Sequence, residues 1–119
     1  MTDRMPHLLL VCLISSILLL AQGLVHADDK GEINHLLEFI AQSDCTYIRN
    51  ETDYTALEAR DHIAGKYNTV KWRIKNAETF IRKIASRSSL SGKQYLIRCG
   101  EKEQPSEQWL FEELTRYRG

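Results

Sequence analysis

The chain lacks most of the features that mark a specialised class of protein. Its 119 residues carry 16 basic and 16 acidic side chains, so the net charge is zero and does not indicate binding to nucleic acid or to a membrane surface. No internal repeat or low-complexity tract is present, which excludes a repeat array. The longest apolar run, residues 8–20, is only 13 residues long, whereas a membrane-spanning helix needs roughly 20.

That apolar run lies in an N-terminal segment, residues 1–27, with the pattern of a cleavable signal peptide. Arg4 precedes the run, and Val25-His26-Ala27 after it fits the small-residue pattern of a signal peptidase site. We therefore expect cleavage between Ala27 and Asp28, and one domain comprising residues 28–119. An uncleaved membrane anchor is the alternative. The prediction is a periplasmic protein that has no membrane association once the signal is removed.

Cysteine and histidine are scarce. Cys12 leaves with the signal, so the mature chain keeps only Cys45 and Cys99. Two cysteines in an exported domain indicate one disulfide, because oxidising compartments favour the bond. Two free thiols or a metal pair are the alternatives. A metal site is disfavoured because His35 and His62 have no zinc-ligand spacing to either cysteine, and no cofactor is expected.

The residue patterns predict a small α+β domain with the element order α-β-α-α-β-α. Apolar periodicity predicts helices near residues 29–43, 55–74, 76–86 and 105–117, and β-rich runs predict strands at 45–49 and 95–99. Asp29, a Thr55–Glu58 capping box and Asn76 are the expected helix caps. Placing the strands antiparallel, with the two cysteines opposed, gives a short two-stranded ribbon packed by helices, in which Tyr47 faces Ile97 and Arg49 faces Tyr95.

Charge along the mature chain is uneven. Residues 60–98 hold ten bases and two acids, while residues 28–59 hold eight acids and two bases. Two interpretations stay open: acidic and basic elements facing each other within the fold, or a basic face for an anionic ligand. Glu78, one of the two acids in the basic segment, is expected to pair with Arg82 or Arg73. The larger aromatic residues are expected in the core: Trp72, Trp109, Phe111 and Tyr117.

A set of residues along the mature chain forms a recognisable pattern. Its members are Ile48-Arg49-Asn50, Tyr54, Glu58-Ala59, His62, Lys66, Arg73-Ile74, Ala77-Glu78, Phe80-Ile81, Ile84-Ala85-Ser86, Ser88, Ser91-Gly92-Lys93, Tyr95, Gln104-Pro105-Ser106, Trp109-Leu110, Glu112-Glu113-Leu114 and Arg116-Tyr117. This pattern resembles the YfeK-like family, small exported proteins of Gram-negative bacteria that form a domain of unknown function. The resemblance covers most of residues 28–119, and Asn76 departs from the Ser or Thr expected at that position. It implies a periplasmic location and a compact mixed fold, and it brings no activity, substrate or catalytic residue.

The most suggestive constellation is His62, Lys66 and Arg73. On a continuous helix these cations follow one border of the apolar stripe, and all three are family-type positions. They form either an anion-binding row or a set of long stems that cover the edge of the core. The loop of residues 86–91 is rich in serine but is not a Walker loop, and a serine nucleophile there would need His62 as its base.

No motif carries a catalytic assignment. We predict a binding or interaction module whose partner is another periplasmic protein or a small anion, without nucleic acid. The alternative is a small hydrolase that uses a serine of the 86–91 loop with His62. A third class is a structural or stress-related accessory protein.

Overall fold

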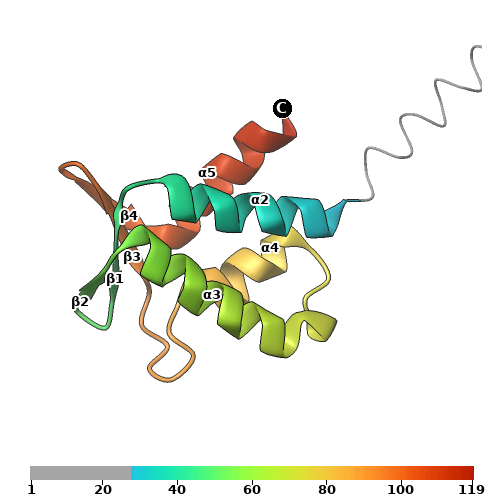
Figure 1. Cartoon of the computed structure of the whole chain (residues 1–119), viewed down its shortest axis with the longest axis horizontal. Coiled ribbons are helices and arrows are strands. Elements are labelled where there is room, and N and C mark those ends of the chain that lie inside the picture. Colours follow the sequence, from blue (N-terminus) through green and yellow to red (C-terminus); the bar gives the residue numbers. More distant parts are fainter. Residues whose placement is uncertain (1–27) are drawn as a thin grey trace, which may run out of the picture.

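The computed structural model describes residues 28–119, and the predicted signal peptide, residues 1–27, lies outside the described residues. Helices α2 and α3 lie side by side, and a small sheet stands at one end of them (Figure 1). The predicted α+β class is confirmed. The elements in chain order are α2 (Asp29–Gln42), β1 (Thr46–Arg49), β2 (Thr52–Tyr54), α3 (Ala56–Val70), a 3-10 turn η1 (Lys71–Arg73), α4 (Ala77–Phe80), a π turn η2 (Ile81–Ala85), β3 (Leu96–Cys99), β4 (Lys102–Pro105) and α5 (Ser106–Arg118).

Helices α2, α3 and α4 begin at side-chain caps. Thr55 and Glu58 form the predicted capping box at the start of α3, and the Asn76 side chain accepts a hydrogen bond from the Thr79 amide at the start of α4. Helix α2 is capped one residue earlier than predicted, because the Asp28 carboxylate, and not Asp29, accepts from the Gly31 amide at 2.8 Å. These caps satisfy amides that the first turn of a helix leaves without partners.

The predicted ribbon is the central pair of a four-stranded antiparallel sheet with the order β2-β1-β3-β4. Its register is the predicted one, since Tyr47 pairs with Ile97. Two strands that the sequence did not reveal flank this pair. Strand β2 returns from a turn in which Asn50 and Glu51 both have positive φ angles, and β4 is a short polar edge strand.

Cys45 and Cys99 form a disulfide, with Cα atoms 4.6 Å apart. Because Cys45 directly precedes β1 and Cys99 ends β3, the bond joins the two central strands at one end of the sheet. It is the pairing predicted from the sequence, and it closes a loop that contains α3 and α4.

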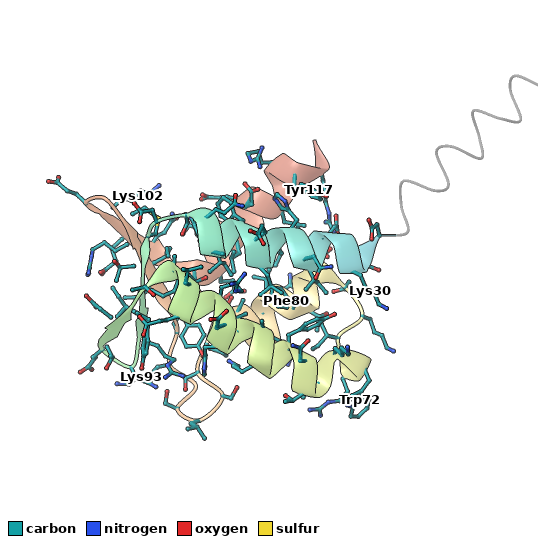
Figure 2. All side chains as sticks on the ribbon, in the orientation of Figure 1. Lys30, Trp72, Phe80, Lys93, Lys102 and Tyr117 are labelled. Carbon is teal, nitrogen blue, oxygen red and sulfur yellow. A yellow bond between two sulfur atoms is a disulfide. The ribbon has the colours of Figure 1, made fainter. Side chains whose placement is uncertain are left out.

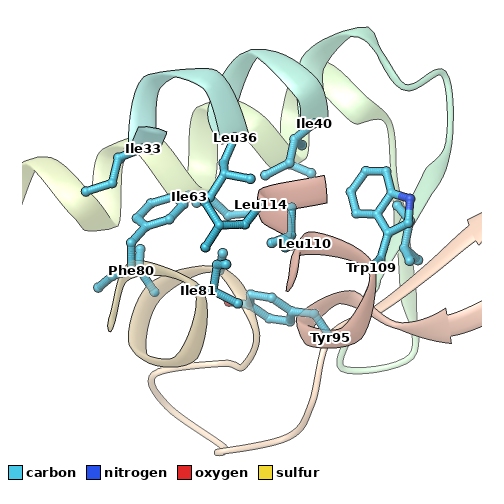
Figure 3. Close-up of a cluster of buried hydrophobic side chains, with 14 of the residues drawn as sticks. Ile33, Leu36, Ile40, Ile63, Phe80, Ile81, Tyr95, Trp109, Leu110 and Leu114 are labelled. Atoms are coloured by element: carbon cyan, nitrogen blue, oxygen red, sulfur yellow. The ribbon is translucent and has the colours of Figure 1, made fainter. Parts of the chain in front are cut away.

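Helices α2, α4 and α5 supply half of the residues in the hydrophobic core cluster. The α2 side chains Ile33, Leu36 and Ile40 point toward Phe80 and Leu114 from α4 and α5, and all five are at most 2% exposed (Figure 3). Tyr47 and Ile97 add the covered face of the sheet to the same cluster. The sheet is therefore packed on one face and solvated on the other, as antiparallel sheets commonly are.

Two of the predicted core aromatics lie at the surface. Trp109 is buried and Phe111 is half-buried, but Trp72 is 70% exposed and Tyr117 is 47% exposed. Trp72 lies at the outer end of α3 in Figure 2, because the helix ends at Val70 and the chain turns through η1. Tyr117 stacks on the His35 ring instead, with ring centroids 3.8 Å apart.

Ion pairs fasten α5 to the other helices. Glu113 is 4% exposed and accepts hydrogen bonds from Arg116, and its carboxylate also contacts His35 of α2. The arginine is the main cause that lowers the pKa of Glu113, and His35 adds to it. Glu78 pairs with a base, as predicted, but that base is Arg118 of α5, at 3.0 Å.

The two arginines predicted for Glu78 are held elsewhere. The Arg82 guanidinium lies over the Phe111 ring, and that of Arg73 lies over the Trp72 ring. Helix α5 thus supplies the partner of an acid 40 residues away in the chain.

Candidate functional site

The covered face of the sheet carries a row of aromatic residues that ends in a cation. Tyr47 and Arg49 are two positions apart on β1, so their side chains point to the same face of the sheet. In the strand register, Tyr47 pairs with Tyr54 of β2 and with Ile97 of β3. Tyr95, just before β3, is also buried. The arginine therefore stands where the covered face meets the start of α3.

A cavity of about 320 Å³ opens at this junction. Its volume lies at the lower end of the range for small-molecule sites. Rings and apolar side chains from the sheet and from α3 form much of its wall. The lining residues are Tyr47, Arg49, Tyr54, Glu58, Ala59, Asp61, His62, Ile63 and Tyr95.

Arg49 connects the two sides of the cavity. Its guanidinium donates hydrogen bonds to the Tyr54 hydroxyl at 2.9 Å and to Nε2 of His62 at 2.7 Å, and it lies 4.7 Å from the centre of the Tyr54 ring. Because arginine can only donate, the accepting nitrogen of His62 carries no proton, and the ring is neutral. Arg49 still has donors that these two bonds do not use.

Lys66 stands one helical turn after His62. Its ammonium donates to the Tyr95 hydroxyl and to the carbonyl oxygen of Arg87, each at 3.0 Å, which leaves one of its three N–H groups free. Within residues 28–119, neither Lys66 nor Arg49 forms an ion pair with a carboxylate.

The charges of Arg49 and Lys66 make it costly to hold further positive charge at this corner of the fold. Burial lowers the pKa of Lys66 to about 8, and the charge of Arg49 adds to this effect. Burial is also the main cause that lowers the pKa of His62, followed by the charges of Arg49 and Lys66. Such perturbed groups beside a cavity are typical of functional sites.

Two carboxylates on the cavity rim have other partners. Glu58 accepts from the Thr55 amide in the capping box, and Asp61 pairs with Arg60 at 2.7 Å. Neither forms an ion pair with Arg49. Arg49 and the neighbouring Lys66 therefore have no carboxylate ion-pair partner within residues 28–119.

The structure brings together two of the three residues in the predicted anion-binding row. His62 and Lys66 lie close enough for their charges to interact, but Arg73 lies beyond the end of α3 and lines a separate groove with Lys66. Arg49 takes its place beside His62. The predicted register already set Arg49 opposite Tyr95, but no sequence signal placed α3 against that corner of the sheet.

The serine-rich loop does not supply a nucleophile beside His62. The Ser88 hydroxyl accepts from the amides of Leu90 and Ser91, and the Ser91 hydroxyl donates to the Asn50 side chain at 2.7 Å. Within residues 28–119, no serine forms a hydrogen bond with His62, so the pairing required by the hydrolase alternative is not formed. The loop instead fastens to the β1–β2 turn.

The part of the chain that the structure describes also lacks two other kinds of site. In residues 28–119, no three His, Cys, Asp or Glu side chains gather in a way that could hold a metal ion. No helix in the same range is long and apolar enough to cross a membrane.

Comparison with known proteins finds relatives of unknown function. A family model described as "Family of unknown function (DUF5329)" matches residues 27–118. A protein of Salmonella typhimurium (strain LT2), described as uncharacterized protein YfeK, is 38% identical over 89 residues, which are 72% of this chain and 74% of the relative. No solved structure matches the chain significantly. Neither description supplies an activity or a ligand.

Proposed function

Because the chain belongs to the DUF5329 family of YfeK-like proteins, whose function is unknown, its role has to be inferred from its own residues. We propose that it is an exported binding module that holds a small anion with an apolar or aromatic body in the cavity beside Arg49. The ligand's anionic group meets the guanidinium, and its apolar part rests against the tyrosine rings.

The observation that carries this proposal is the unneutralised charge. Arg49 and Lys66 are partly withdrawn from water, and neither pairs with a carboxylate in residues 28–119. Two adjacent cations without a counterion repel each other, and a bound anion removes that cost. A carboxylate or phosphate also suits the planar donor fork of arginine.

The cavity wall supports an apolar body on the ligand. Tyr54 and Tyr95 present ring surfaces, and Ala59 and Ile63 extend the apolar wall from α3. Transfer of an aromatic or aliphatic group onto such surfaces is favourable because it removes apolar area from water. A bare ion such as chloride uses none of this surface, so an organic anion is the better fit.

Export is the other part of the proposal. The segment of residues 1–27 has the pattern of a cleavable signal, and the described domain contains a disulfide between Cys45 and Cys99. Disulfides persist in oxidising compartments such as the bacterial periplasm. A periplasmic location is therefore proposed together with the binding role.

The test compares benzoate with benzamide by isothermal titration calorimetry on the protein purified from periplasm. The two molecules share shape and ring, but only benzoate is charged. We expect benzoate to bind at least ten-fold more tightly. Arg49→Gln should remove at least ten-fold of that affinity, because one charge-assisted hydrogen bond contributes about 1.5–3 kcal/mol.

The matched control is Arg98→Gln. Arg98 is an arginine of the same sheet that pairs with Asp53 and Glu103, away from the cavity. This variant makes the same charge change and should keep the wild-type affinity for benzoate. Equal binding of benzamide, or equal losses in the two variants, would contradict the proposed site.

A further inference from the structure

A second groove of about 440 Å³ lies on the other side of Lys66 from the Arg49 cavity. Three cations from different elements line it: Lys66 of α3, Arg73 of η1 and Lys83 of η2. Thr69, Thr79 and Ser89 add hydroxyl groups, and no acidic residue lines the groove. Part of the basic segment predicted from the sequence therefore gathers on one surface.

These cations are free of carboxylate partners. Within residues 28–119, none of the three forms an ion pair. Arg73 instead lies over the exposed ring of Trp72, with its guanidinium 5.1 Å from the ring centre. This contact leaves the guanidinium N–H groups available at the edge of the groove.

Lys66 links the groove to the cavity. Its ammonium bonds to the hydroxyl of Tyr95, a residue that lines the cavity, while the Lys66 side chain lines the groove. Along α3, the rise from His62 to Val70 is about 12 Å at 1.5 Å per residue. A ligand that reaches both sites must therefore span roughly 12 Å and pass Lys66.

We infer that the groove holds a second anionic group of the same ligand, and that this group is a phosphate. The inference rests on the proposed function of the Arg49 cavity. Three cations and several hydroxyl donors match a phosphate ester, which carries close to two charges and three acceptor oxygens, better than a singly charged carboxylate. The ligand class is a soluble organic bisphosphate whose apolar spacer crosses Lys66.

The alternative role of these cations is structural. Val70, Ile74 and Ile84 form the apolar floor of the groove, and the stems of Arg73 and Lys83 can cover them while their charged ends stay in water. In that case the charges serve solubility and bind no phosphate specifically. The two roles differ in how affinity responds to a second phosphate.

The test measures the affinity of the purified protein for hexyl phosphate and for hexane-1,6-diyl bisphosphate, which is long enough to reach from the cavity to the groove. The bisphosphate should bind at least ten-fold more tightly. The double variant Arg73→Gln/Lys83→Gln should remove that advantage and leave the affinity for hexyl phosphate unchanged. Its control is Lys71→Gln/Lys75→Gln, which makes the same charge change outside the groove.

The outcomes separate the two proposals. If hexyl phosphate binds in an Arg49-dependent way but the bisphosphate has no advantage, the groove site is wrong and the cavity stands. If hexyl phosphate does not bind at all, the proposed function fails. If the control variant loses the advantage of the bisphosphate to the same extent, the attraction is due to general charge, and the proposed phosphate site in the groove is wrong. A lipid headgroup is the other source of phosphate. If the protein sediments with phosphatidic acid vesicles and the Arg73→Gln/Lys83→Gln variant does not, the proposal of a soluble ligand is wrong and the groove binds a lipid headgroup.

Discussion

Removal of the disulfide between Cys45 and Cys99 is the perturbation with the largest expected effect on stability. The two residues are 54 positions apart, so reduction frees a long loop in the unfolded chain. The chain-entropy relation gives about 4 kcal/mol for a loop of this length. For a domain of this size, that corresponds to a fall in Tm of about 20 °C. Small domains are stable by only about 5–15 kcal/mol, so the loss is a large part of the total.

The assay is urea unfolding followed by circular dichroism, with and without dithiothreitol. The double variant Cys45→Ser/Cys99→Ser should lose about 4 kcal/mol and should not respond to dithiothreitol. Reduction of the wild-type protein should give the same loss. The dependence of the unfolding free energy on urea should also steepen, because the unfolded chain exposes more surface without the cross-link.

Two results would refute this reasoning. One is a change below about 1 kcal/mol on reduction, which would mean that the bond constrains the unfolded chain far less than the chain-entropy relation gives. The other is two free thiols in the unfolded, unreduced protein. The second result would also remove a main support for the proposed export.

Three further predictions concern single positions. Glu113→Gln should lower the unfolding free energy by about 1–3 kcal/mol, because it weakens a buried charged network. The control Glu112→Gln, at an exposed position, should change the unfolding free energy by less than about 0.5 kcal/mol. Chemical denaturation measures the unfolding free energy of both variants. Since the pKa of Glu113 is lowered in the fold, its contribution is present above the ordinary glutamate pKa and is lost as the pH falls through the lowered value, which melts at graded acid pH can follow. Glu51→Gly should stabilise the protein by about 1 kcal/mol, since Glu51 has a φ of 67° that glycine adopts without strain, and a thermal melt that shows no gain would contradict this. Mass spectrometry of the protein recovered from cells that express the full chain should find Asp28 as the first residue, and retention of Ala27 and the segment before it would contradict the predicted cleavage.

The elements that carried strong local signals were predictable from the sequence. The capping box at Thr55 and the cap at Asn76 are short-range patterns, and both are confirmed. The strand register followed from opposing the two cysteines, because a disulfide allows only a narrow range of Cα separations. Tyr47 therefore pairs with Ile97 as predicted.

The parts that the sequence did not reveal depend on contacts between distant segments. Strand β2 follows a turn with positive φ angles at Asn50 and Glu51, where the usual glycine of such a turn is missing. The residue type of Trp72 alone predicts a core position, but α3 ends before this residue and leaves it exposed.

The candidate site was predictable only in part. His62 and Lys66 belong to one helix face, so their proximity follows from helical spacing. Arg49 joins them only because α3 packs across the end of the sheet, which periodicity does not specify. The groove of Arg73 and Lys83 likewise needs the turn at η1 to bring two separate segments together.

The most direct test of the central claim is the ionisation of His62 with and without benzoate. Nuclear magnetic resonance can follow the imidazole protons of His62 as the pH changes. We predict a His62 pKa below the ordinary histidine value in the free protein, because burial and the charges of Arg49 and Lys66 disfavour the imidazolium. Bound benzoate should raise this pKa, so that binding tightens as the pH falls. A His62 titration that benzoate leaves unchanged would contradict an anion site at Arg49.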